Sequence, residues 1–152
     1  MEYYAQDELF NKHDLDNLQL KNTAVALGVF DAMHLGHLEI IDDVVKYAKK
    51  LQEKGARNVL VSMAGDGAVL VTEDGQEFRS EAPKGKVVNS VGAGDSMVAG
   101  FIAGYLEDGS YGKAFQMGVC TGSASAFSEE LATKAEVIAL LDSNKKLFAG
   151  EQ

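Results

Sequence analysis

The chain has 152 residues, 46% of them hydrophobic, and a formal net charge of -9. That length suits one domain with one sizeable core. An acidic chain is not drawn to nucleic acid or to an anionic membrane, because Lys and Arg would have to neutralise those phosphates. The apolar runs are too short to cross a bilayer, and the amino terminus lacks a basic-then-apolar signal. We therefore expect a soluble, cytoplasmic single domain over residues 1–152, with no nucleic-acid or membrane partner.

The amino-terminal part of the sequence predicts a strand, a helix and a second strand. Residues 1–21 are polar and weakly periodic, and we interpret them as a loosely held lead-in. Residues 23–30 form a continuous apolar run of strand length, which is typical of a strand buried on both faces of a parallel sheet. Over residues 38–51 apolar side chains recur at helical spacing, and Gly55 marks the end of that helix. Residues 58–62 are predicted to form the next strand.

The middle of the sequence predicts antiparallel hairpins. Two short apolar segments, residues 59–62 and 68–72, flank a turn. The turn residues are Gly65, Asp66 and Gly67. A second predicted turn at residues 74–75 precedes the segment 76–80, so antiparallel strands are expected to adjoin the parallel ones.

The last third of the sequence predicts three helices. The first begins at the segment 92–95, is rich in small residues and ends at residues 108–109. The other two cover roughly residues 111–128 and 134–141, where apolar residues recur at three- and four-residue spacing.

Small side chains dominate two of these predicted helices. Glycines and alanines along residues 99–104 and 118–126 predict close packing of the helices on the sheet. Cys120, the only cysteine, is interpreted as a small apolar residue on a helix. The order of elements predicts the α/β class: a layered α/β/α domain with a mainly parallel sheet plus antiparallel hairpin strands.

The start of the first predicted helix has the residues of an anion site. The small side chains of this segment leave successive backbone N–H groups accessible to a bound phosphate; its residues are Gly92, Ala93 and Gly94. Asp95 follows in the first turn, where the helix dipole favours the carboxylate that a general base must be. These features fit phosphoryl transfer, in which positioning and charge stabilisation dominate. A tight turn followed by an ordinary helix cap is the alternative.

Three segments in order, residues 59–68, 87–101 and 122–128, carry a resemblance to a known family. The stretch 43–141 resembles the ribokinase-like carbohydrate kinases, most closely their 1-phosphofructokinase and tagatose-6-phosphate kinase branch. The resemblance implies a ribokinase-like carboxy-terminal half over residues 43–152. It also implies ATP and Mg as cofactors, with an adenine nucleotide and a sugar phosphate as partners.

The same resemblance implies roles for individual residues. Asp95 would be the catalytic base that deprotonates the sugar hydroxyl, and residues 92–94 the anion hole for the transferred phosphoryl group. The nucleotide loop would fall at residues 62–67, and a plain hairpin turn is the alternative there. Its candidate nucleotide-binding residues are Ser62, Gly65, Asp66 and Gly67.

The resemblance does not extend over a whole kinase of this family. In such a kinase the first half supplies most of the sugar pocket, a lid sheet and an Asn-x-x-Glu motif, and none of these is found before Asp43. We therefore expect phosphotransferase activity to be weak or absent. A strand edge and apolar surface that the first half would cover predict a two-fold homodimer.

A second resemblance precedes the first. Residues 24–37 resemble the opening of the bacterial FAD synthetase type of nucleotidyltransferase. The resemblance covers about residues 22–41 and marks the segment 1–42 as nucleotidyltransferase-like. That resemblance implies that His34 and His37 bind ATP phosphates, as two imidazoles at a helix start can donate to an anion. A helix start kept as scaffold, or a metal site with Asp31, is the alternative. We infer a chimera; a nucleotidyltransferase fragment and a folded scaffold without catalytic role stay open.

Overall fold

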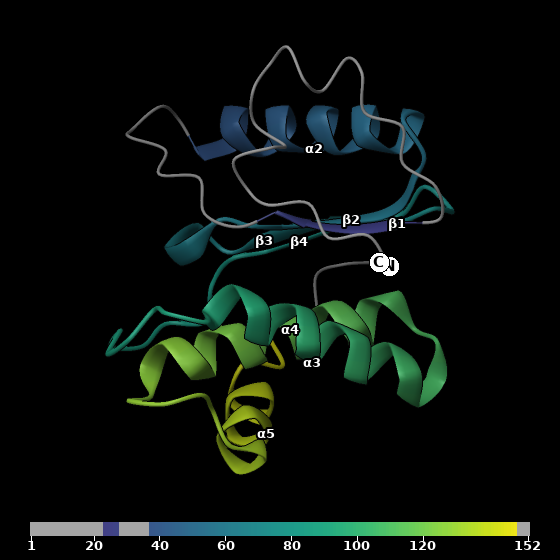
Figure 1. Ribbon diagram of the computed structural model, residues 1–152. Helices are drawn as coiled ribbons and strands as arrows, with labels where there is room; N and C mark the ends of the chain where they lie inside the picture. Colours follow the sequence, from purple (N-terminus) through teal and green to yellow (C-terminus); the bar gives the residue numbers. More distant parts are fainter. Residues whose placement is uncertain (1–22, 28–36, 149–152) are drawn as a thin grey trace.

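The computed structural model describes residues 23–27 and 37–148, and side chains from Asp42 onward. Its elements form three layers (Figure 1). Helix α2 (His37–Glu53) covers one face of a four-stranded sheet, while α3 (Ala93–Asp108) and α4 (Tyr111–Phe127) cover the other, with α5 (Lys134–Ser143) beyond them. The predicted layered α/β/α class is confirmed. The predicted lead-in over residues 1–21 lies outside the described part of the chain.

The sheet has the order β1-β2-β3-β4, with strands β1 (Thr23–Leu27), β2 (Ala56–Ser62), β3 (Ala68–Val71) and β4 (Glu77–Ser80). Strand β1 runs parallel to β2, whereas β2 with β3 and β3 with β4 are antiparallel. Among the described strands the prediction of a mainly parallel sheet is therefore wrong. Only the β1-to-β2 connection contains a crossover helix, and the two short turns that follow can return the chain only antiparallel.

Alternate residues of the two central strands separate the core into two layers. Val59, Val61, Val69 and Val71 pack with the apolar face of α2. Leu60 and Leu70 point to the opposite face and pack with Phe115, Val119 and Cys120 of α4. Successive side chains of a strand lie on opposite faces, so near-continuous apolar segments such as these belong to strands covered on both sides. Cys120 is fully buried in α4, which confirms its predicted role.

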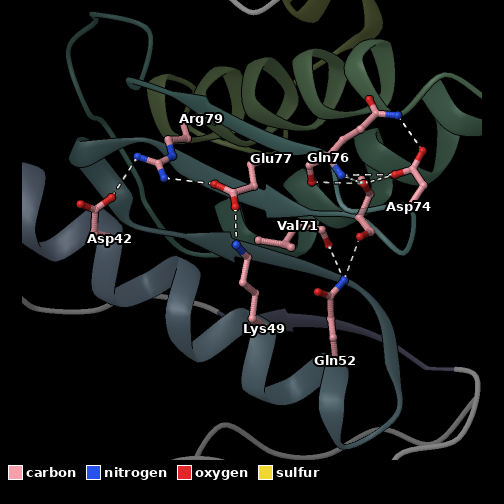
Figure 2. Close-up of polar contacts among 9 residues, drawn as sticks. Asp42, Lys49, Gln52, Val71, Asp74, Gln76, Glu77 and Arg79 are labelled. Atoms are coloured by element: carbon pink, nitrogen blue, oxygen red, sulfur yellow. Dashed lines mark hydrogen bonds and ion pairs between the residues drawn. The ribbon is translucent and has the colours of Figure 1, made fainter.

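Helix α2 is joined to the outer strand β4 by exposed ion pairs (Figure 2). Lys49 Nζ lies 2.7 Å from Glu77 Oε1, and Arg79 bonds both Glu77 at 3.1 Å and Asp42 at 3.2 Å. The hydrogen bond from Lys49 is the main reason why the pKa of Glu77 lies below its usual value. Gln52, one turn further along α2, donates to a carbonyl oxygen just after β3 at 2.9 Å. Exposed pairs add little stability individually, so they supplement the apolar packing of α2 on the sheet.

The glycines of α3 and α4 lie where these two helices contact each other, and we call this contact the seam. A Cβ on Gly100 would stand 2.4 Å from Thr121 Oγ1, and one on Gly122 would stand 2.9 Å from the carbonyl oxygen of Ala93. The prediction that these small residues pack the helices on the sheet is therefore wrong, because they pack α3 and α4 on each other. Larger residues of α4, among them Phe115 and Val119, contact the sheet instead. Glycine is needed in the seam because the helix backbones approach too closely for a side chain.

The helix ends match their local sequence. Gly109 ends α3 in the left-handed conformation, with φ of +73°, as glycine does readily. Thr133 and Glu136 form a capping box at the start of α5, and this hydrogen bonding keeps the pKa of Glu136 below its usual value. None of the described helices is long and apolar enough to span a membrane.

Candidate nucleotide and phosphate site

A cavity of about 540 Å³ opens where four segments meet. They are the turn after β2, the segment that leaves β4, the start of α3 and the last turns of α4. The cavity brings together five of the residues predicted from sequence, although the two segments that carry them are far apart in the chain. These five are Ser62, Gly65, Asp66, Ala93 and Gly94.

The turn after β2 forms the first wall. Its backbone closes on itself, because the N–H of Met63 donates to the carbonyl of Gly67 at 2.8 Å and the N–H of Asp66 donates back to Met63 at 3.0 Å. Ser62, Gly65 and Asp66 line the cavity, while Gly67 is buried and packs against the end of β4. The predicted nucleotide loop is thus a compact turn in which Gly67 holds the shape.

The first turn of α3 forms the second wall. Gly92 is the N-cap in the left-handed conformation, with φ of +78°, and no side chain caps this helix end. The N–H of Ala93 donates to Ser90 at 3.2 Å. The N–H groups of Gly94 and Asp95 follow in the first turn, where an α-helix offers no acceptor. Such groups, together with the helix dipole, favour an anion at this end.

Asp95 directly follows the cavity residue Gly94 and has an exposed side chain. It is the acidic residue of the first turn of α3. Asp95 and Gly92 flank the cavity-lining pair in sequence but are not themselves part of the lining. A carboxylate at this position is open to a second substrate approaching from solvent.

Helix α4 forms the floor of the cavity. Gly122, Ser123, Ala126 and Phe127 line it. The carbonyl oxygen of Ala126 accepts from the N–H groups of Val88 at 2.8 Å and Asn89 at 3.1 Å. Val87 and Val88 are exposed, and these two hydrogen bonds attach their segment to the end of α4.

Residues 81–85, just after β4, form a third wall that sequence reasoning missed. Pro83 is buried, and a Cβ on Gly85 would stand 2.4 Å from the Phe127 ring. Lys84 lies between these two packed residues and lines the cavity. Among the described cavity residues Lys84 is the one cation, beside the carboxylates of Asp66 and Glu81. The only proline of the chain, directly followed by a lysine, was the available signal.

The histidine pair cannot be placed at this cavity. His34 and Asp31 lie outside the described residues, and His37 is described only as the first residue of α2. Helix α2 covers the face of the sheet opposite α3 and α4 (Figure 1). Phosphate binding by His34 and His37 stays a prediction. Within the part of the chain with described side chains, no three His, Cys, Asp or Glu residues gather as a metal site.

Comparison with known proteins identifies the protein family of this chain. Residues 22–137 match the model of the pfkB family of carbohydrate kinases, and the chain belongs to this family. The match includes residues 24–37, for which the resemblance to FAD synthetase stays a prediction.

Individual relatives agree with this assignment. A 1-phosphofructokinase of Bacillus subtilis is 55% identical over 101 residues, which are 66% of this chain and 33% of that enzyme. A putative phosphofructokinase from Staphylococcus aureus has a similar structure, with a TM-score of 0.69 and 34% identity over 86% of this chain and 44% of the other. Arabidopsis thaliana ribokinase, solved with ribose and ATP, shares the fold at a TM-score of 0.63 and 17% identity, covering 84% of this chain and 42% of its own. The chain thus spans about a third of the length of the curated relative it matches at 55% identity.

Proposed function

We propose that this chain carries the nucleotide-binding and phosphoryl-transfer side of an ATP-dependent sugar-phosphate kinase of the 1-phosphofructokinase type. The observation that carries the proposal is the joining of two predicted segments at one cavity. The turn residues Ser62, Gly65 and Asp66 face the same space as Ala93 and Gly94. The alternative interpretations, a plain hairpin turn and an ordinary helix start, do not predict that the two segments line one cavity.

The shape and chemistry of the cavity suit an adenine nucleotide. Its volume of about 540 Å³ lies within the range of roughly 300–1,000 Å³ typical of small-molecule sites. One end offers the free N–H groups of the α3 start, which suit phosphate oxygens. The lining also includes Pro83, Val87 and Phe127, apolar surface that suits a base.

The residues of this chain would act in transfer as follows. Asp95 accepts the proton of a sugar hydroxyl, and that oxygen forms the new bond to the γ-phosphorus of ATP while the bond to the β-phosphate oxygen breaks, releasing ADP. The N–H groups of Gly94 and Asp95 hold the oxygens of the transferred group. By relation to the 1-phosphofructokinase of Bacillus subtilis, the second substrate is fructose 1-phosphate.

Magnesium enters this proposal as the counter-ion of the nucleotide. The described residues contain no cluster of three metal-ligating side chains.

We further propose that the chain binds nucleotide even if transfer is weak. The cavity residues supply the nucleotide side, and the expectation of weak or absent transfer concerns the sugar side. A cytoplasmic location remains a prediction from the sequence.

Calorimetric titration with Mg-ADP and Mg-ATP tests the proposal. Gly94 is a suitable position for a blocking variant, since its φ is not positive and a Cβ there would meet nothing within 4 Å. Gly94→Leu should fold normally and lose at least about tenfold in nucleotide affinity, because the side chain fills the phosphate end. Ala99→Leu, at an exposed position of the same helix, should bind like wild type.

Two outcomes would overturn the proposal. One is the absence of heat with either nucleotide at millimolar concentration. The other is full binding by Gly94→Leu together with loss of binding in the double variant His34→Ala, His37→Ala. That second result would favour the nucleotidyltransferase hypothesis and the chimera it belongs to.

A further inference from the structure

Two buried serine hydroxyls connect α3, α4 and the segment before α5. Ser125 Oγ donates to Ser96 Oγ at 3.0 Å and accepts from the backbone N–H of Ala132 at 3.1 Å. Ser125 is 2% exposed and Ser96 is 8% exposed. Around them lie apolar and glycine residues of the seam between the two helices.

Each of the three connected segments belongs to the candidate site or touches it. Ser96 directly follows Asp95 in the first turn of α3. Ser125 lies between Ser123 and Ala126, which both line the cavity floor. Ala132 follows Leu131, whose Cδ2 is 3.1 Å from where a Cβ of Gly92 would stand. One hydroxyl therefore connects the first turn of α3, the cavity floor and the segment packed against Gly92.

The seam would pack without these hydroxyls, because alanine fills nearly the same space as serine. A buried hydroxyl brings a desolvation cost unless its donor and its acceptor find partners, and the hydroxyl of Ser125 has a partner for each. Directional bonds in such a dry seam restrict sliding of one helix along the other, which apolar contacts alone resist less well. Binding groups must be held within roughly 0.5 Å of their productive geometry, so restricting this movement matters at the start of α3.

We propose that Ser125 is a positioning residue for the phosphate-binding turn at residues 92–95. Its hydroxyl holds the first turn of α3 at the distance from α4 and residues 131–132 at which the N–H groups of Gly94 and Asp95 meet a phosphate. The proposal rests on the proposed function and adds to it a residue that does not touch the ligand.

The test compares ADP affinity with unfolding by urea in four variants. Ser125→Ala and Ser96→Ala each break the bond between the hydroxyls and should weaken ADP binding about tenfold in the fully folded protein. The double variant should lose no more than Ser125→Ala alone, because Ser125→Ala already lacks the bond that Ser96→Ala removes. Thr121→Val is the control: Thr121 lies in the same seam and on the same helix, but its hydroxyl donates only within α4, to Met117 at 2.7 Å. It should lower the unfolding midpoint and leave ADP affinity unchanged.

Each result has one meaning. If wild type does not bind ADP, the proposed function fails. If wild type binds and Ser125→Ala binds equally well, the positioning role fails while the proposed function stands. If Thr121→Val weakens ADP binding as much as Ser125→Ala, the hydroxyls are merely structural and the inference is overturned. If Ser125→Ala does not fold, Ser96→Ala decides, since it keeps the bond from Ala132 to Ser125.

Discussion

The backbone of Gly67 packs directly on the carbonyl oxygen of Ser80. A Cβ at position 67 would stand 1.9 Å from that oxygen, and the backbone of Gly67 has φ of +103° and ψ of -138°. Both the space and the conformation require glycine. The contact fixes the turn that carries Ser62, Gly65 and Asp66 against the segment that carries Lys84. Two walls of the cavity are therefore set relative to each other by one residue that does not line it.

Gly67→Ala should destabilise the fold by about 2–5 kcal/mol, the sum of backbone strain and steric overlap. Gly75→Ala is the matched control, since Gly75 also has positive φ, +84°, but a Cβ there would meet nothing within 4 Å. It should cost only about 1 kcal/mol, from strain alone. Urea unfolding of both variants checks the difference. Equal losses would mean that the overlap with Ser80 is relieved at no cost.

Asp95→Asn should abolish most of any phosphoryl transfer to fructose 1-phosphate, because the amide cannot accept the hydroxyl proton. The loss expected for a positioned base is on the order of 100- to 10,000-fold. ADP affinity should change little, since the substitution keeps the backbone N–H of position 95 and the side chain there does not line the cavity. A coupled assay of ADP release measures the rate, and calorimetry measures the affinity. A variant with the wild-type rate would show that another group accepts the proton.

Lys84→Gln should weaken ADP and ATP binding, because Lys84 is the one cation among the described cavity residues. We expect a loss of about tenfold at low salt that shrinks as salt screens the charge. Lys86→Gln is the control, as Lys86 is exposed nearby but not part of the lining. Titrations at two salt concentrations check both variants. Equal behaviour of the two lysine variants would assign the effect to net charge alone.

Burial raises the pKa of the Cys120 thiol from 9.0 to about 12. At a given pH below 9 the folded protein should therefore hold roughly a thousandfold less thiolate than the unfolded chain, and a thiol reagent should modify it correspondingly slowly. Because the pKa of this thiol is higher in the folded than in the unfolded protein, the neutral thiol contributes its full share to the free energy of unfolding below pH 9. That contribution is lost as the pH rises from 9 towards 12, where the unfolded chain ionises first. Urea unfolding of wild type and Cys120→Ala between pH 8 and 11 checks the sign. A smaller pH dependence in wild type than in the alanine variant would contradict it.

We propose, as a prediction from the sequence, that the chain forms a two-fold homodimer at micromolar concentration. Helix α3 exposes Leu106 at 78% and Ile102 at 45%, one turn apart, and these side chains are the suggested contact. Leu106→Glu should then shift the protein to monomer without loss of stability. Sedimentation equilibrium of wild type and variant measures this. A monomeric wild type would refute the prediction, and a dimeric variant would place the contact elsewhere.

Local patterns in the sequence were sufficient for most elements. The apolar periodicity of α2, the glycine at the end of α3 and the apolar spacing in α5 act within a few residues, so the predicted ranges differ from the observed ones only at their ends. The same holds for the anion site, because glycine, small residues and an aspartate at a helix start are themselves local features. Family membership followed from three such segments in order.

Tertiary structure alone decided which segments meet. Glycines of α3 and α4 face each other rather than the sheet, since a missing side chain does not specify its partner in the sequence. Lys84 became part of the cavity because Pro83 and Gly85 pack on either side of it, and the bond from Ser125 to Ser96 joins residues 29 positions apart. The sequence by itself determined that a glycine turn and an aspartate-bearing helix start exist. Their common cavity depends on long-range packing, whose free energy comes from contacts that no local pattern encodes.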